Sequence, residues 1–300
     1  MGSLANNHVT LCQINYRFAS KAEGQQRLLA NTDYYNQLTQ TDVEWRMRKT
    51  GATIEELKAF AKDCVCDFTD KEKTAVAEAV SFVEERLRKM GAILPFPKED
   101  IVFIKTTMMD EGNAFGYTHK TEVYLGIKAL ESSNNSVETN LKVVIAHELF
   151  HCLTRNSSAF RDRMYGLLGF TITGCDFVFS PTIREMIMAN PDVEHFDNYA
   201  EFSINGVNRF CIPLTLYTRT WSEALSKDNK AFFNYCQNVL VPIDELDTYF
   251  DFDIIDDPVE ECLALHFSYA VVYGPAELPN ELVVEKPMLL DKIIALMKKF

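Results

Sequence analysis

The pattern H-E-x-x-H, which runs from His147 to His151, is the feature of this sequence with the clearest chemical potential. On a helix, four residues advance by about 400° and about 6 Å, so both imidazoles leave the same face and can share one metal ion. Glu148 lies one step around the helix, where its carboxylate can reach a water held by that ion. Because burying these groups unpaired in an apolar helix is costly, we interpret the pattern as a metal site rather than as core or surface residues.

A catalytic zinc site uses three protein ligands and keeps one position open, which requires a third ligand downstream. We expect it in the segment DPVEECLA, residues 257–264. There Asp257 can cap a helix, Pro258 can be its first residue, and Glu260 can complete a capping box. That structural role for Glu260 favours Glu261 as the ligand, with Glu260 as the alternative. Glu261 also shares a helix face with small residues that allow close packing against the histidine helix, namely Ala264, Ser268 and Val272.

The region that precedes these motifs, residues 1–95, has the pattern of a helical region. Capping-box sequences begin at Thr53 and Thr69, and the second precedes an apolar stripe that ends at Gly91. Such a stripe is more typical of core packing than of a recognition surface. We therefore expect this region to support the rest of the chain rather than to form a separate partner-binding module.

After this region the periodicity changes to that of strands, which we expect at residues 101–105 and 122–126. The helix that carries the histidines is expected from 137 to about 154, with Asn135 or Ser136 as its cap.

Residues 175–255 have a mixed pattern, with alternating apolar positions at 200–219 and a helical patch at 230–241. Two helices, at about 258–273 and 286–299, complete the chain. The sequence thus predicts an α+β fold.

Composition excludes several classes of function. The chain has 300 residues, with 30 Lys and Arg against 43 Asp and Glu, and a formal net charge of −13. Nucleic acids and anionic membranes are therefore disfavoured partners. The first residues lack the features of a secretory signal, and no window of about 18 apolar residues could span a bilayer, so we expect a soluble, cytoplasmic protein. We expect its eight cysteines to be reduced thiols.

Two stretches, HELFHCLTRN at 147–156 and PVEECLALHF at 258–267, carry a resemblance to a known family. With them the chain resembles the gluzincin type of zincin metallopeptidase. It is also similar along nearly its whole length to a little-characterised bacterial group of HExxH proteins. Further stretches support this similarity: 34–39, 104–107, 116–118 and 190–192.

The resemblance implies a zinc ion with His147, His151 and Glu261 as ligands and Glu148 as the general base. It leaves the substrate open, either a peptide or a small amide. One departure concerns the acidic residue that in gluzincins often follows the ligand glutamate by four positions and orients a zinc-bound histidine. Here that position is Leu265, so the supporting group must come from elsewhere.

The resemblance also implies a zincin-like fold with a small mixed sheet. We expect a helical N-terminal region, 1–95, packed on a catalytic domain, 96–300, which carries an insertion at about 160–255. The strand at 122–126 is expected to align an extended peptide by strand addition.

A peptidase of this kind needs a donor that stabilises the oxyanion. We favour Tyr217 for this role; the other candidates are Tyr199, His195 and Arg219.

Two other functions fit the same motifs. A His/His/Glu set can hold iron for oxygen chemistry, or zinc for a reaction on something other than a peptide. A zincin fold without turnover could instead serve as a binding protein, which the loss of the acid at Leu265 favours and the presence of Glu148 opposes.

Overall fold

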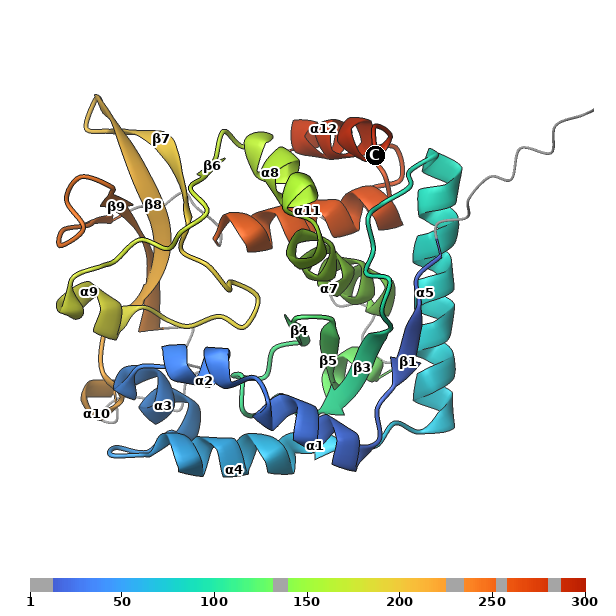
Figure 1. The fold of residues 1–300 in the computed structure, drawn as a ribbon, viewed down its shortest axis with the longest axis horizontal. Coiled ribbons are helices and arrows are strands. Elements are labelled where there is room, and N and C mark those ends of the chain that lie inside the picture. The colour runs from blue at the N-terminus through green and yellow to red at the C-terminus, as the bar shows by residue number, and fades with distance from the viewer. Residues whose placement is uncertain (1–12, 132–139, 225–234, 252–257, 280–286) are drawn as a thin grey trace, which may run out of the picture.

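The computed structural model describes residues 13–131, 140–224, 235–251, 258–279 and 287–300 (Figure 1). Within these ranges the chain combines helices with two sheets, so the α+β class is confirmed. The cysteines in these ranges are all free, as expected. No helix in the described part of the chain is long and apolar enough to cross a membrane.

The first sheet has the strand order β1-β3-β5-β4, with β2 paired to β3. β1 and β5 run parallel to β3, whereas β2 and β4 run antiparallel to their neighbours. The strands are β1 (Tyr16–Phe18), β2 (Val65–Cys66), β3 (Ile101–Thr106), β4 (Gly116–His119) and β5 (Glu122–Gly126). β3 and β5 confirm the two predicted strands. β1 and β2 belong to the N-terminal region, which therefore shares this sheet with the rest of the chain.

The position of β5 corrects one expectation. β5 lies between β3 and β4, and both of its edges are occupied by ladder hydrogen bonds. A substrate strand therefore cannot add to residues 122–126. The edge strand next to β5 is β4, which the sequence does not predict because a segment of four residues is too short to show a period.

The main core lies where long helices pack on one another and on the first sheet. α5 ends at Gly91, which adopts a left-handed conformation with φ of 72°, and a capping box of Thr69 and Glu72 begins it, as predicted. α7 begins later than predicted, after Asn140, whose side chain accepts a hydrogen bond from the Lys142 backbone; Asn135 and Ser136 lie outside the described residues. The helices of this core are α5 (Asp70–Met90), α6 (Ile127–Leu130), α7 (Leu141–Asn156), α8 (Ser158–Gly166), α11 (Val259–Val272) and α12 (Pro287–Met297).

Shorter helices of the N-terminal region lie along one side of the molecule (Figure 1). A capping box formed by Thr53 and Glu56 begins the last of them, as predicted. These helices are α1 (Lys21–Leu29), α2 (Thr32–Gln37), α3 (Gln40–Met47) and α4 (Ile54–Cys64).

The second sheet is antiparallel throughout and has the order β10-β9-β8-β7-β6. The alternating pattern at 200–219 is confirmed as two of these strands. The predicted helical patch at 230–241 is wrong where the structure describes it, because Val239 and Val241 pair with Leu214 and Ile212 of the neighbouring strand. Its strands are β6 (Thr171–Ile172), β7 (Asn198–Ile204), β8 (Val207–Tyr217), β9 (Cys236–Pro242) and β10 (Phe250–Asp251), and α9 (Pro181–Met186) and α10 (Trp221–Ala224) lie nearby.

Candidate metal centre

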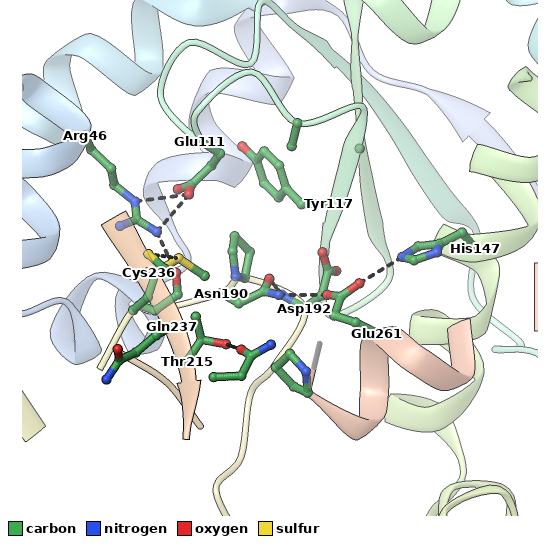
Figure 2. Close-up of a pocket in the computed structure, with 17 residues that line it drawn as sticks. Arg46, Glu111, Tyr117, His147, Asn190, Asp192, Thr215, Cys236, Gln237 and Glu261 are labelled. Atoms are coloured by element: carbon green, nitrogen blue, oxygen red, sulfur yellow. Dashed lines mark hydrogen bonds and ion pairs between the residues drawn. The ribbon is translucent and has the colours of Figure 1, made fainter. Parts of the chain in front are cut away.

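The predicted metal ligands meet where α7 packs against the first turn of α11. His147 Nε2 lies 3.1 Å from Glu261 Oε2, and His151 Nε2 lies 3.9 Å from the same oxygen. One donor atom from each of the three residues falls within 4.8 Å of the others. In Figure 2 the side chains of His147 and Glu261 point toward one another. The structure therefore brings together residues that are more than a hundred positions apart in the sequence.

His151 supplies the observation that tests whether this cluster suits a metal ion. Its side chain is fully buried, yet Nε2 makes no hydrogen bond among the described residues. Burial disfavours the imidazolium, but the carboxylates of Asp192, Glu260 and Glu261 overcome this effect and raise the pKa of His151 to about 10. The cluster thus stabilises a positive charge at Nε2, and a divalent cation with nitrogen and oxygen ligands fits it.

Glu260 has a different role from the one its sequence position suggests. Its carboxylate accepts hydrogen bonds from His151 Nδ1 at 2.9 Å, from the Thr154 hydroxyl at 2.6 Å and from the Tyr165 hydroxyl at 2.7 Å. Burial opposes ionisation of Glu260, but the hydrogen bond from His151 and those from the two hydroxyls hold its pKa below the usual value.

The predicted capping box in α11 is therefore wrong. The residue that caps this helix is Pro258, without a side-chain hydrogen bond, and Asp257 lies outside the described residues. Glu260 is 5% exposed, and its carboxylate is bonded to His151 Nδ1. It therefore orients His151, a role that the apolar side chain of Leu265 cannot fill. A carboxylate on Nδ1 fixes the tautomer of His151 and leaves the Nε2 lone pair for an ion. The adjacent pair Glu260–Glu261 was the only signal of this arrangement in the sequence.

Glu148 lies in a tight space beside the edge strand. Its side chain is 2% exposed, and its Oε2 makes no hydrogen bond among the described residues. Burial raises its pKa well above the usual value, and the carboxylate of Asp192 adds to the shift. A Cβ atom at Gly116, the first residue of β4, would lie 2.8 Å from the Glu148 carboxyl carbon. The Glu148 carboxylate can therefore occupy this position only because Gly116 has no side chain.

The segment Asn190–Asp192 holds two residues that chemical reasoning from the sequence did not assign. Asn190 Nδ2 donates a 2.7 Å hydrogen bond to Glu261 Oε1 and so orients that carboxylate. Asp192 Oδ1 lies 3.9 Å from His151 Nε2, and Glu148, His151 and Asp192 form a second group that could hold a cation. Burial also raises the pKa of Asp192. No spacing rule links this segment to the HExxH motif, although it belongs to the stretches that carry the resemblance.

A cavity of about 370 Å³ opens beside the centre. Figure 2 shows His147 and Glu261 on one side of it and Arg46 with Glu111 on the other. Arg46 is 4% exposed and is held by Asp42, Glu111 and the Ala189 carbonyl, so its charge is already balanced by neighbouring carboxylates.

None of the residues proposed as oxyanion donors lines this cavity. The Tyr217 hydroxyl donates a 3.0 Å hydrogen bond to Asp42 Oδ1, and its ring stacks on Trp45. Tyr217 is 2% exposed and is not part of the cavity wall. Tyr199, His195 and Arg219 do not line the cavity either. The structure therefore places Tyr217 in a contact between α3 and β8.

Comparison with family models, curated proteins and solved structures finds no match to this chain. The geometry of the centre is consequently the basis for any assignment of function.

Proposed function

We propose that this chain is a zinc-dependent hydrolase with a zincin-like fold, and that it cleaves peptide bonds. The observation that carries the proposal is the buried Nε2 of His151, which has no hydrogen-bond partner among the described residues and clusters with His147 and Glu261. The other ring nitrogen of His151, Nδ1, is bonded to Glu260. Two histidines and one glutamate, with further coordination left open, are the ligand set of catalytic zinc in peptidases.

When bound, zinc would polarise the scissile carbonyl and make a water acidic enough to attack near neutral pH. The residues of the chain have separate tasks. Glu260 and Asn190 hold His151 and Glu261 in position. Glu148 accepts a proton from the attacking water and delivers it to the leaving nitrogen as the C–N bond breaks. The proximity of Glu148 to His151 supports this assignment.

The edge strand β4 supports a peptide as the substrate. Its first residues, Gly116 and Tyr117, line the cavity beside His147 and Glu261. A peptide that adds to β4 would bring a backbone carbonyl to Glu148, which lies against Gly116.

Metal analysis and one variant test the proposal. We expect the purified protein to carry stoichiometric zinc and not iron by emission spectroscopy. Glu148→Gln should retain the metal and lose about 10²-fold or more in the hydrolysis of a peptide library. Glu201→Gln, a change at an exposed carboxylate of β7, is the matched control and should leave the rate unchanged.

Other results would contradict the proposal. Protein without stoichiometric zinc, or a Glu148→Gln variant with full hydrolysis, would exclude a zinc peptidase. Bound iron would point to oxygen chemistry instead. Zinc with peptide affinity but without cleavage at any pH would favour a binding protein.

A further inference from the structure

The backbone of β4 alternates between its partner strand and the outer edge of the sheet. Thr118 N–H donates to the carboxylate of Asp192 and not to β5, which shows that the outer edge includes Thr118. In an antiparallel pair every second residue directs its N–H and C=O to the same side, so Gly116 also directs its backbone groups outward. Gly116 lines the cavity, so this is where an added strand could pair.

Two residues further along, the same edge is closed. Asp192 Oδ1 accepts hydrogen bonds from Thr118 N at 2.8 Å and from the Thr118 hydroxyl at 2.5 Å. Arg155 stabilises this contact, because its guanidinium lies 3.7 Å from the Asp192 carboxylate and donates a 2.9 Å hydrogen bond to the Pro191 carbonyl. Thr118 is fully buried as a result. A substrate strand cannot pair beyond this point.

The contact of Asp192 with Thr118 leaves little room for substrate on one side of the peptide bond that is cleaved. Gly116 and Thr118 are two positions apart, which is about 6.6 Å along a strand. One residue of an extended peptide, about 3.3 Å, and its terminal group fill that length. The cavity volume of about 370 Å³ is also near the lower end for small-molecule sites. The site therefore fits the end of a chain better than its middle.

Strand direction and charge select which end of the peptide lies there. A strand that adds antiparallel to β4, the more stable pairing, directs its amino end toward Thr118. There it meets Asp192, whose Oδ2 makes no hydrogen bond among the described residues. A carboxylate attracts an α-ammonium and repels an α-carboxylate. The net charge of −13 also favours the approach of cationic ligands.

We propose that the chain is an aminopeptidase, which removes single residues from the free amino end of short peptides, with the substrate α-ammonium bound by Asp192. This inference rests on the proposed function. In each cycle water adds to the carbonyl carbon of the first residue, the C–N bond that follows breaks, and the leaving amine gains a proton.

One peptide in three forms tests the direction of cleavage. Zinc-loaded protein is incubated with the peptide carrying free ends, an acetylated amino end or an amidated carboxyl end, and the products are identified by mass spectrometry. We expect the free and amidated forms to lose one residue at a time from the amino end at similar rates. The acetylated form should react at least about tenfold more slowly, because acetylation removes the charge that Asp192 binds. Internal fragments, release from the carboxyl end, or equal hydrolysis of the acetylated form would overturn the inference.

Variants test the assigned residue. Asp192→Asn should reduce the preference for the free over the acetylated peptide by about tenfold. Glu194→Gln changes a carboxylate two positions after Asp192 that pairs with Arg155 and does not line the cavity, so this variant should leave the preference unchanged. Circular dichroism of both variants reports whether they fold. An unchanged preference in folded Asp192→Asn contradicts the assignment.

A binding measurement separates this inference from the proposed function. The zinc-loaded Glu148→Gln protein is titrated by calorimetry with leucinamide and with N-acetyl-leucinamide. We expect at least about tenfold tighter binding of leucinamide. Equal affinity, or affinity for neither amide, refutes recognition of the amino end whether or not peptides are hydrolysed. If wild-type protein hydrolyses no peptide while leucinamide is preferred, the peptidase reaction is wrong and the ammonium site stands.

Discussion

Replacing Glu260 by Gln tests the reasoning about the metal centre most directly. The substitution conserves shape, but an amide has one acceptor oxygen where the carboxylate has two. Glu260 accepts from His151 Nδ1, the Thr154 hydroxyl and the Tyr165 hydroxyl. At least one of these buried donors must lose its acceptor, and the negative charge that favours a cation on His151 is removed.

The expected magnitude follows from these contacts. Loss of a partner that orients a metal-binding histidine weakens metal affinity by about 10- to 100-fold, or roughly 1.4–2.8 kcal/mol. One buried donor without an acceptor should also lower the free energy of unfolding by about 1–3 kcal/mol. Glu261→Gln removes the proposed ligand itself, so its effect on zinc affinity should be larger than that of Glu260→Gln.

Zinc affinity is measured by competition with a chromophoric chelator, and the free energy of unfolding of the metal-free protein by urea titration. Glu55→Gln is the control, since the Glu55 side chain is 76% exposed and, among the described residues, forms an ion pair with Lys58 alone. Zinc affinity of Glu260→Gln equal to that of the wild type would refute the role of Glu260 in orienting His151. A larger loss of zinc affinity in Glu260→Gln than in Glu261→Gln would mean that Glu260 is the ligand and Glu261 the orienting group.

Three further predictions concern other parts of the molecule. Gly116→Ala places a Cβ about 2.8 Å from the Glu148 carboxyl carbon and must displace that side chain, so we expect kcat to fall by about 10²-fold with the zinc content unchanged; an unchanged kcat would show that Glu148 does not depend on this space. Burial raises the pKa of Asp110 to about 7, so the Asp110 carboxyl binds its proton more tightly in the folded protein than in the unfolded chain. The free energy of unfolding should therefore fall as pH rises from about 4 to about 7. Asp110→Asn should remove this contribution in urea titrations at about pH 5 and about pH 8, and an identical pH dependence in both proteins would contradict it. Tyr217→Phe removes a buried hydrogen bond to Asp42 and should lower the free energy of unfolding by about 1–3 kcal/mol with kcat unchanged; a large loss of kcat in the folded variant would restore Tyr217 as a catalytic candidate.

Local patterns in the sequence were sufficient for several elements of the fold. The helix that begins after Thr69 and ends at Gly91 has both of its ends marked by residues within the helix itself. β3 was recognisable because the residue pattern at 101–105 changes from the period of a helix to that of a strand. β9 was not, because its apolar spacing resembles that of a helix, and pairing with β8 decides its conformation.

The same distinction applies to Tyr217 and β4. Tyr217 has the chemistry of an oxyanion donor, but the packing of α3 against β8 places its hydroxyl on Asp42. β4 is four residues long, and its place at the edge of the sheet depends on pairing with β5. Neither outcome follows from residue types along one stretch of chain, because each depends on a partner distant in sequence or in another element.

By itself, the sequence determined that His147, Glu148 and His151 could serve one metal ion, because the period of a helix places residues four positions apart on one face. Only the tertiary structure decided the separate roles of Glu260 and Glu261. The carboxylate of Glu261 lies beside His147 Nε2, whereas that of Glu260 accepts a hydrogen bond from His151 Nδ1. The tertiary structure also placed Asp192 across the edge of β4, which closes one side of the cavity. His151 and Glu260 are 109 residues apart. Contacts at such separations are set by how helices and strands pack, and the hydrophobic burial that drives this packing is non-directional and leaves no local pattern in the chain.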